Sequence, residues 1–108
     1  MTRLLLLALA LALAGTVHAR GNAEAGKQKA SQVCAACHGP AGNKPSAPEN
    51  PILGGQHYDY LVHALKDYKS GKRDNAVMKG FAASLSRQDI EDLAAWFASQ
   101  ESALHYQR

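Results

Sequence analysis

The sequence lacks several features that mark common structural classes. Its longest apolar run, Leu4–Ala14, has 11 residues, too few to span a hydrocarbon core of about 30 Å at roughly 1.5 Å per residue. No segment alternates apolar and polar residues with β-branched enrichment, so strands are not expected, and no internal repeat is visible. The formal net charge is only +3. Without a strongly basic patch, the sequence gives no indication of nucleic-acid binding.

The N-terminal segment has the layout of a secretory signal peptide. Arg3 gives a positive start, Leu4–Ala14 forms the apolar region, and Val17–Ala19 ends in a small-x-small cleavage signal. We expect residues 1–19 to be removed, which leaves residues 20–108 as a periplasmic domain. An uncleaved membrane anchor is the alternative, and the short apolar run disfavours it. A domain this small buries little surface, so a bound cofactor would help to stabilise it.

The remaining sequence predicts an all-α fold with long loops. Residues 39–55 contain all four prolines and four of the nine glycines, which excludes regular structure there. A loop this long in a small domain usually has a function, and covering a flat cofactor would be one. Helical apolar spacing and caps at Asn22, Gly71 and Ser86 with Asp89 predict helices at Ala23–Cys34 and His57–Ser70, a short helical turn at Ala76–Ala82, and a last helix from Ser86 to near Gln100.

The segment Cys34-Ala35-Ala36-Cys37-His38 carries the chemistry of the chain. Two thiols at this spacing on one turn of backbone can form thioethers with the two vinyl groups at one edge of a porphyrin. His38 then presents one imidazole nitrogen to the iron, and its other nitrogen should donate to a backbone carbonyl that fixes the ring. The motif predicts one haem c, bound covalently through Cys34 and Cys37, with His38 as the proximal iron ligand.

Three other roles for the only two cysteines, Cys34 and Cys37, compete with haem attachment. A zinc site is disfavoured because adjacent Cys37 and His38 are a poor pair for one tetrahedral ion and no second Cys/His cluster exists. A redox-active disulfide needs a strand-loop-helix context that the sequence lacks. A structural disulfide would leave the stability of so small a core unexplained.

The second axial ligand of the iron is a separate question. After removal of residues 1–19, Met78 is the only methionine, and thioether sulfur is an established ligand of haem iron. We therefore expect Met78 to be the distal ligand. A methionine that only fills the core is the alternative, and His57, His63 and His105 are the rival ligands.

The order of helix, Cys-x-x-Cys-His, Pro/Gly loop, helix, methionine and helix resembles the class I cytochromes c. More narrowly, the chain is similar to a single domain of the bacterial two-haem c-four-type cytochromes. Only one haem motif is present, so the chain corresponds to half of that arrangement or to a stand-alone relative. The segments that carry the resemblance are Cys34–Gly39, Pro51–Gln56 with Tyr60, Asp67–Arg73, and Met78 followed by Leu85–Gln100.

The resemblance implies roles for further residues. Pro51 matches the proline whose carbonyl accepts a hydrogen bond from the proximal histidine, here His38. Gly26 matches the glycine at which the first helix crosses the last against an aromatic residue, here Trp96, whereas periodicity alone turns Phe97 inward. The other positions that the resemblance places at the haem pocket are Leu53, Tyr60, Leu65, Phe81 and Leu93, with Tyr60 and Arg73 as candidates to reach the propionates.

Two strong axial ligands would leave no open iron position for a substrate, which favours electron transfer and not an enzyme. We expect a monomeric periplasmic carrier that exchanges single electrons with a donor and an acceptor protein in brief encounters, without a membrane span after cleavage. A haem subunit fixed to a dehydrogenase or other oxidoreductase is the alternative, and a haem enzyme or gas sensor with a labile sixth ligand is a third. The basic cluster is either a solvated helix end or a docking face for an acidic partner; it comprises Lys66, Lys69, Lys72, Arg73 and Lys79.

Overall fold

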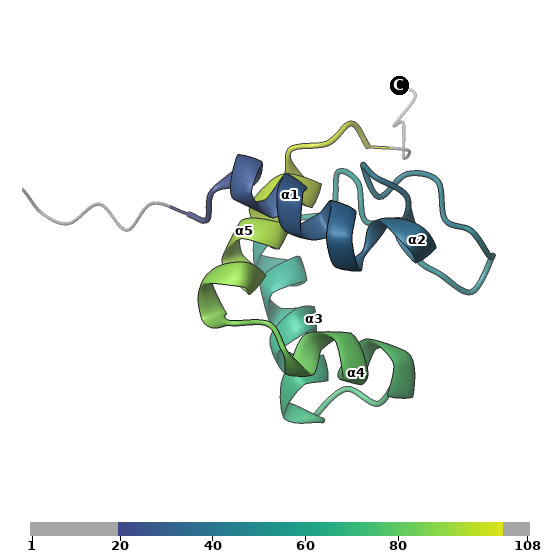
Figure 1. Ribbon diagram of the computed structural model, residues 1–108, viewed down its shortest axis with the longest axis vertical. Coiled ribbons are helices and arrows are strands. Elements are labelled where there is room, and N and C mark those ends of the chain that lie inside the picture. Colours follow the sequence, from purple (N-terminus) through teal and green to yellow (C-terminus); the bar gives the residue numbers. More distant parts are fainter. Residues whose placement is uncertain (1–19, 103–108) are drawn as a thin grey trace, which may run out of the picture.

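The computed structural model describes residues 20–102, which form an all-helical domain (Figure 1). This part of the chain contains no β-strand, which confirms the predicted fold class. None of its helices combines the length and apolarity that crossing a membrane requires. The predicted signal segment and His105 lie outside the described residues. The helices are α1 (Ala23–Val33), α2 (Ala35–His38), α3 (Tyr58–Ser70), α4 (Ala76–Ala83) and α5 (Arg87–Ala98).

The predicted helices agree with the observed ones to within one or two residues at most ends. The Asn22 side chain accepts a hydrogen bond from the Ala25 amide, and Gly71 ends α3 at φ 82°, a conformation that favours glycine. Two features were not predicted. The haem-attachment motif forms a helical turn of its own, α2. The segment expected to be a short turn is the two-turn helix α4, because the Asn75 side chain caps it by accepting from the Met78 amide.

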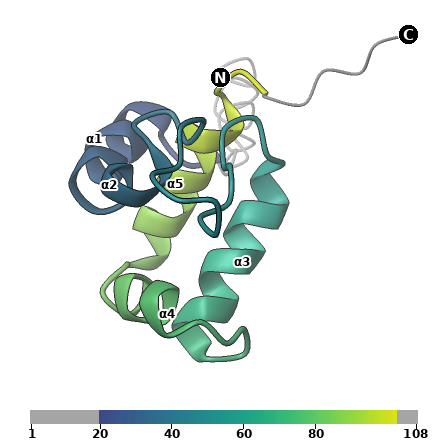
Figure 2. The same cartoon turned by 90° about the vertical axis from the view of Figure 1, so that its right-hand side faces the viewer.

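Helix α1 crosses α5 at Gly26, as the resemblance implied (Figures 1 and 2). A Cβ atom on Gly26 would lie 1.9 Å from the carbonyl oxygen of Asp92 and 2.9 Å from Cβ of Trp96, so only glycine permits this approach. Phe97 is buried at 3% exposure, while Trp96 is partly buried and donates from Nε1 to the Pro40 carbonyl at 3.1 Å. Both aromatic side chains of α5 therefore contribute to packing.

The apolar core lies where α1 and α3 meet α5 and where α4 packs on α3. Helix α3 packs against both α4 and α5, so the core continues from the helix crossing down to α4 (Figure 2). Burial of such side chains contributes about 25 cal/mol per Å² of apolar surface removed from water. The core residues are Ala30, Leu61, Ala82, Leu85, Ile90, Leu93, Ala94 and Phe97.

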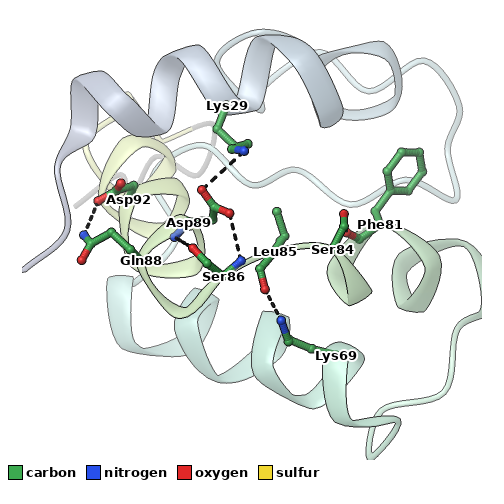
Figure 3. Close-up of polar contacts among 9 residues, drawn as sticks. All are labelled: Lys29, Lys69, Phe81, Ser84, Leu85, Ser86, Gln88, Asp89 and Asp92. Carbon is green, nitrogen blue, oxygen red and sulfur yellow. Dashed lines mark hydrogen bonds and ion pairs between the residues drawn. The ribbon is translucent and has the colours of Figure 1, made fainter.

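Polar contacts hold the junction between α4 and α5 against two other helices (Figure 3). Ser86 and Asp89 form the predicted capping box: the Ser86 amide donates to Asp89 Oδ2 at 2.9 Å and the Asp89 amide donates to Ser86 Oγ at 3.0 Å. Lys29 of α1 lies 3.4 Å from Asp89, and the ammonium of Lys69 on α3 donates to the Leu85 carbonyl. The connection from α4 to α5 and the first turn of α5 are thereby fixed to α3 and α1, respectively.

The loop between α2 and α3 folds back on itself and onto α5. Gly42, at φ 75°, presents its carbonyl to the amides of Leu53 at 2.8 Å and Gly54 at 3.2 Å. The Gly55 amide donates to the Phe97 carbonyl at 2.9 Å. These bonds give the proline-rich segment a defined path without regular structure, and they bring Pro51 next to α2.

Candidate haem site

A cavity of about 630 Å³ separates α2 from α4. Its volume lies within the range of small-molecule and cofactor sites. Every part of the fold except α5 contributes to its wall. The lining residues are Val33, Cys34, Cys37 and His38 from the α1–α2 region, Glu49, Asn50 and Pro51 from the loop, Leu65 and Tyr68 from α3, Arg73 and Asn75 from the α3–α4 connection, and Val77, Met78, Phe81, Ala82 and Leu85 from α4 and its end.

The turn α2 presents the attachment motif to this cavity. Helix α1 stops at Val33, and the Cys34 carbonyl then accepts hydrogen bonds from the amides of Cys37 at 3.2 Å and His38 at 3.0 Å. This tight turn brings both thiols and the imidazole to one wall of the cavity. The five-residue motif is therefore a local structure that its own backbone hydrogen bonds define.

The ring of His38 is held in one orientation. His38 is 6% exposed, and its Nδ1 atom lies 2.8 Å from the Pro51 carbonyl oxygen. A carbonyl can only accept, so Nδ1 carries the proton and donates it. In the neutral ring this leaves the other nitrogen, Nε2, as the one with a lone pair that can bind a metal. The pairing with Pro51 that the resemblance implied is present in the structure.

The two cysteines do not have the properties of a redox-active or zinc-binding pair. Burial raises the pKa of the Cys34 thiol to about 11, whereas reactive dithiols have a lowered thiol pKa. A zinc site needs several converging ligands, and among residues 20–102 no three His, Cys, Asp or Glu side chains gather in a way that would hold a metal ion. The structure therefore favours the haem-attachment interpretation over both alternatives.

Met78 lies on α4 and lines the same cavity as His38. The Asn75 cap fixes the start of α4 through its contact with the Met78 amide at 2.9 Å. The rival ligands in the described part of the chain are placed elsewhere: His57 precedes α3 and His63 lies on α3, both exposed, and neither lines the cavity.

The structure brings together some of the other residues that the resemblance implied and separates the rest. Leu65, Arg73 and Phe81 line the cavity. Leu53, Tyr60 and Leu93 do not: Leu93 is buried in the core at 1% exposure, Leu53 packs beside that core, and Tyr60 is 50% exposed. Tyr60 still reaches the cavity wall indirectly, because its hydroxyl accepts a hydrogen bond from Arg73 Nη1 at 3.3 Å.

Several lining residues were not expected from the sequence as site residues. Tyr68 shares the helical spacing of Leu61 and Leu65 in the second predicted helix, and Leu85 is the apolar residue directly before the Ser86 cap. Both positions carry a signal of burial without one of function. Val33 lies on the helical face that the spacing of Gly26 and Ala30 marks, so it too carries a signal of burial. Asn50 and Val77 carry no such signal, because only the fold brings them to the cavity.

The wall of the cavity suits a flat, largely apolar cofactor with a central metal. Nitrogen and thioether donors of His38 and Met78 form a donor set typical of haem iron, and the two thiols are available on the same wall. Val77 and Phe81, which line the cavity, are 62% and 46% exposed. Large apolar side chains left open around a site indicate a binding surface. The residues present therefore fit haem.

A family model described as cytochrome c matches residues 23–101. This chain belongs to the cytochrome c family. Family membership implies covalently bound haem c with iron, and the single motif at Cys34–His38 provides for one such group. The all-helical fold of the described residues is the cytochrome c fold.

The relatives include cytochromes of which this chain covers about half and one that it covers almost completely. Cytochrome c4 from Pseudomonas aeruginosa is 49% identical over 98 residues, 91% of this chain and 48% of that protein. A crystal structure of reduced recombinant cytochrome c4 from Pseudomonas stutzeri has a TM-score of 0.71 at 43% identity, covering 80% of this chain and 49% of that one. Cytochrome c-554(548) from Halomonas halodenitrificans is 43% identical over 84 residues, 75% of this chain and 99% of that protein. The chain thus spans about half the length of the cytochromes c4 that it matches.

Proposed function

We propose that this cytochrome is a periplasmic carrier of single electrons whose haem iron is ligated by His38 and Met78. The observation that carries the proposal is that these two side chains, from α2 and α4, line one cavity together with both cysteines. Met78 is the only methionine among residues 20–102, and the rival ligands His57 and His63 do not line the cavity.

Each residue of the site has a distinct role in this proposal. Cys34 and Cys37 attach the group, and the Pro51 carbonyl orients His38 and raises its basicity as a ligand through the 2.8 Å hydrogen bond. The apolar wall, including Leu65, keeps water away from the metal. Haem iron supplies a one-electron redox couple, and a thioether ligand in an apolar pocket raises its potential.

Arg73 is the proposed partner of a haem propionate. It lines the cavity, its guanidinium lies 4.9 Å from the centre of the Tyr68 ring, and it donates to Tyr60. The hydrogen bond to Tyr60 is the main cause that raises the pKa of Arg73 above its already high ordinary value, so the side chain stays charged. Tyr60 contributes by positioning this cation.

The cellular setting completes the proposal. Residues 1–19 act as a cleaved signal peptide, and residues 20–108 form a monomeric, non-enzymatic domain in the periplasm. Donor and acceptor are redox proteins that bind transiently through small interfaces. Within the basic cluster, Lys69 contacts the Leu85 carbonyl, and Arg73 contacts Tyr60 and Tyr68. The other exposed lysines of the cluster, Lys66, Lys72 and Lys79, are therefore the ones that would steer an acidic partner.

The ligand assignment is tested by replacing Met78 with alanine in the haem-loaded protein. The ferric wild type is expected to show the sulfur-to-iron charge-transfer band in the far red and to bind added imidazole weakly. M78A should lose the band and bind imidazole much more tightly. The control is V77A, which trims the neighbouring cavity residue and should keep the band. A far-red band that persists in M78A would refute the assignment.

The carrier role is tested on the native protein. Its intact mass is expected to equal residues 20–108 plus one haem, and a pyridine haemochrome spectrum should report thioether linkage. Size-exclusion chromatography should give a monomer. Stable co-elution with a second chain would instead support the subunit alternative, and a high-spin ferric wild type would support the enzyme or sensor alternative.

A further inference from the structure

The loop that carries Pro51 has few backbone donors with which to hold itself in place. Pro45, Pro48 and Pro51 lack an amide hydrogen. The position of the Pro51 carbonyl, and with it the hydrogen bond to His38, must therefore depend on bonds made by the residues between the prolines. Ser46 and Asn50 make them.

Both residues bond to the same atom, the carbonyl oxygen of Cys37. The Ser46 amide donates to it at 3.0 Å and Asn50 Nδ2 donates to it at 3.2 Å. Asn50 Nδ2 also donates to Ser46 Oγ at 3.3 Å, and the Asn50 amide donates to the Ala47 carbonyl at 3.1 Å. The Cys37 carbonyl is one of those at the end of α2, which a helix leaves without a partner of its own.

These contacts join the two sides of the His38–Pro51 hydrogen bond. Cys37 precedes His38, and Asn50 precedes Pro51. The Asn50–Cys37 bond is therefore one residue away from the His38–Pro51 bond in both chain segments. The proline restricts the backbone of Asn50 to extended conformations. Because the backbone is limited in this way, the bond from the Asn50 side chain to Cys37 also fixes the direction of the Pro51 carbonyl. On the far side of Pro51, the Leu53 amide holds the loop to Gly42 at 2.8 Å.

We propose that Asn50 is a positioning residue for the proximal ligand: its side-chain bond to the Cys37 carbonyl holds the Pro51 carbonyl against His38 and so tunes the reduction potential. This inference rests on the proposed role of His38 and extends it to a residue that touches neither ligand. A stronger hydrogen bond from Nδ1 raises the basicity of the imidazole, which favours the ferric iron and lowers the potential. Loss of the Asn50 donor should therefore raise the potential.

The test uses two variants that remove the donor but differ in volume, N50A and N50L, in the haem-loaded protein. Loss of one neutral hydrogen bond corresponds to about fivefold more frequent opening, so the His38 Nδ1 proton of the ferrous protein should exchange about fivefold faster in both variants. Both should also show a more positive reduction potential. Thermal unfolding of each variant is measured alongside, because a purely structural role would change stability without changing either of these readouts.

S46A is the matched control. It removes the hydroxyl that accepts from Asn50 at 3.3 Å and that itself donates to the Cys37 carbonyl at 3.5 Å. The shorter bonds to that carbonyl from the Ser46 amide and from Asn50 remain, so proton exchange and potential should stay near wild type. If only N50A changed exchange and potential, the side-chain volume and not the hydrogen bond would be responsible, and the proposal would be wrong. If exchange and potential stayed at the wild-type values in both N50A and N50L, the proposal would be overturned as well. The wild-type haemochrome and far-red spectra test the proposed function separately, because they do not depend on Asn50.

Discussion

The carbonyl oxygen of Asp92 occupies the place that a side chain on Gly26 would need. The distance from that oxygen to a Cβ atom built on Gly26 is 1.9 Å, far inside van der Waals contact. The carboxylate of the same Asp92 accepts from the Asn22 amide at 2.7 Å and from Gln88 Nε2 at 2.8 Å. One residue of α5 thus fixes both the approach of α1 and the position of its first turn.

We expect G26A to lower the free energy of unfolding by about 2 kcal/mol, because the two helices must move apart to admit a methyl group. Urea denaturation of the haem-loaded protein measures this loss. The matched control is G80A on α4, where a Cβ atom meets nothing within 4 Å. There the ordinary helix preference for alanine should add up to about 1 kcal/mol. Equal effects of the two substitutions would contradict the packing argument.

The bond from Lys69 to the Leu85 carbonyl is expected to stabilise the end of α4. K69M removes a charged donor and should lower the free energy of unfolding by about 2 kcal/mol. K66M removes the same charge from an exposed position one turn earlier on α3, and a change within about 0.5 kcal/mol is expected there. If both variants lose the same stability in chemical denaturation, net charge and not this contact is responsible.

The capping box gives the fold an acid-sensitive element. The hydrogen bond from the Ser86 amide, with smaller contributions from the Ser86 hydroxyl and Lys29, lowers the pKa of Asp89. A carboxyl whose pKa is lower in the folded state stabilises the fold above its unfolded pKa of about 3.9, and this stabilisation is lost as the pH falls through the folded value. The stability difference between wild type and D89N should thus be constant above about pH 5 and shrink below about pH 4.

Urea titrations at a series of pH values would follow that difference. D74N, which removes an exposed carboxylate from the α3–α4 connection, is the control, and we expect it to follow the wild-type stability profile. A difference between wild type and D89N that stayed the same down to about pH 3 would show that Asp89 caps α5 without its charge.

Arg73 is expected to raise the reduction potential, since a positive charge near the iron disfavours the ferric state. R73Q should shift the potential to a more negative value, and the shift should diminish at high ionic strength because salt screens exposed charges. The control is R87Q, which removes an arginine paired with Glu91 on α5 and away from the cavity. Cyclic voltammetry measures the reduction potential of both variants. Equal shifts of the potential in R73Q and R87Q would argue against a specific role of Arg73.

The amino-acid sequence alone was sufficient to predict the cofactor and the positions of the helices. The haem motif is local: five consecutive residues hold both attachment points and one ligand, and α2 forms from their own backbone bonds. Capping residues and apolar spacing likewise act within one or two turns, so the helix positions and the Ser86–Asp89 box followed from the sequence. The resemblance to known cytochromes added the Pro51 partner and the Gly26 crossing, which no local pattern would have revealed.

Only the tertiary structure decided which distant residues share the cavity. Helical periodicity identifies a buried face but not what that face is buried against. The sequence therefore could not distinguish Leu65, which lines the cavity, from Leu93, which lies in the core. The bond from Asn50 to Cys37 spans thirteen residues of irregular chain, where no repeating geometry links sequence to position. Contacts of this kind are determined by how the helices pack and the loop closes, and they determine how His38 is held.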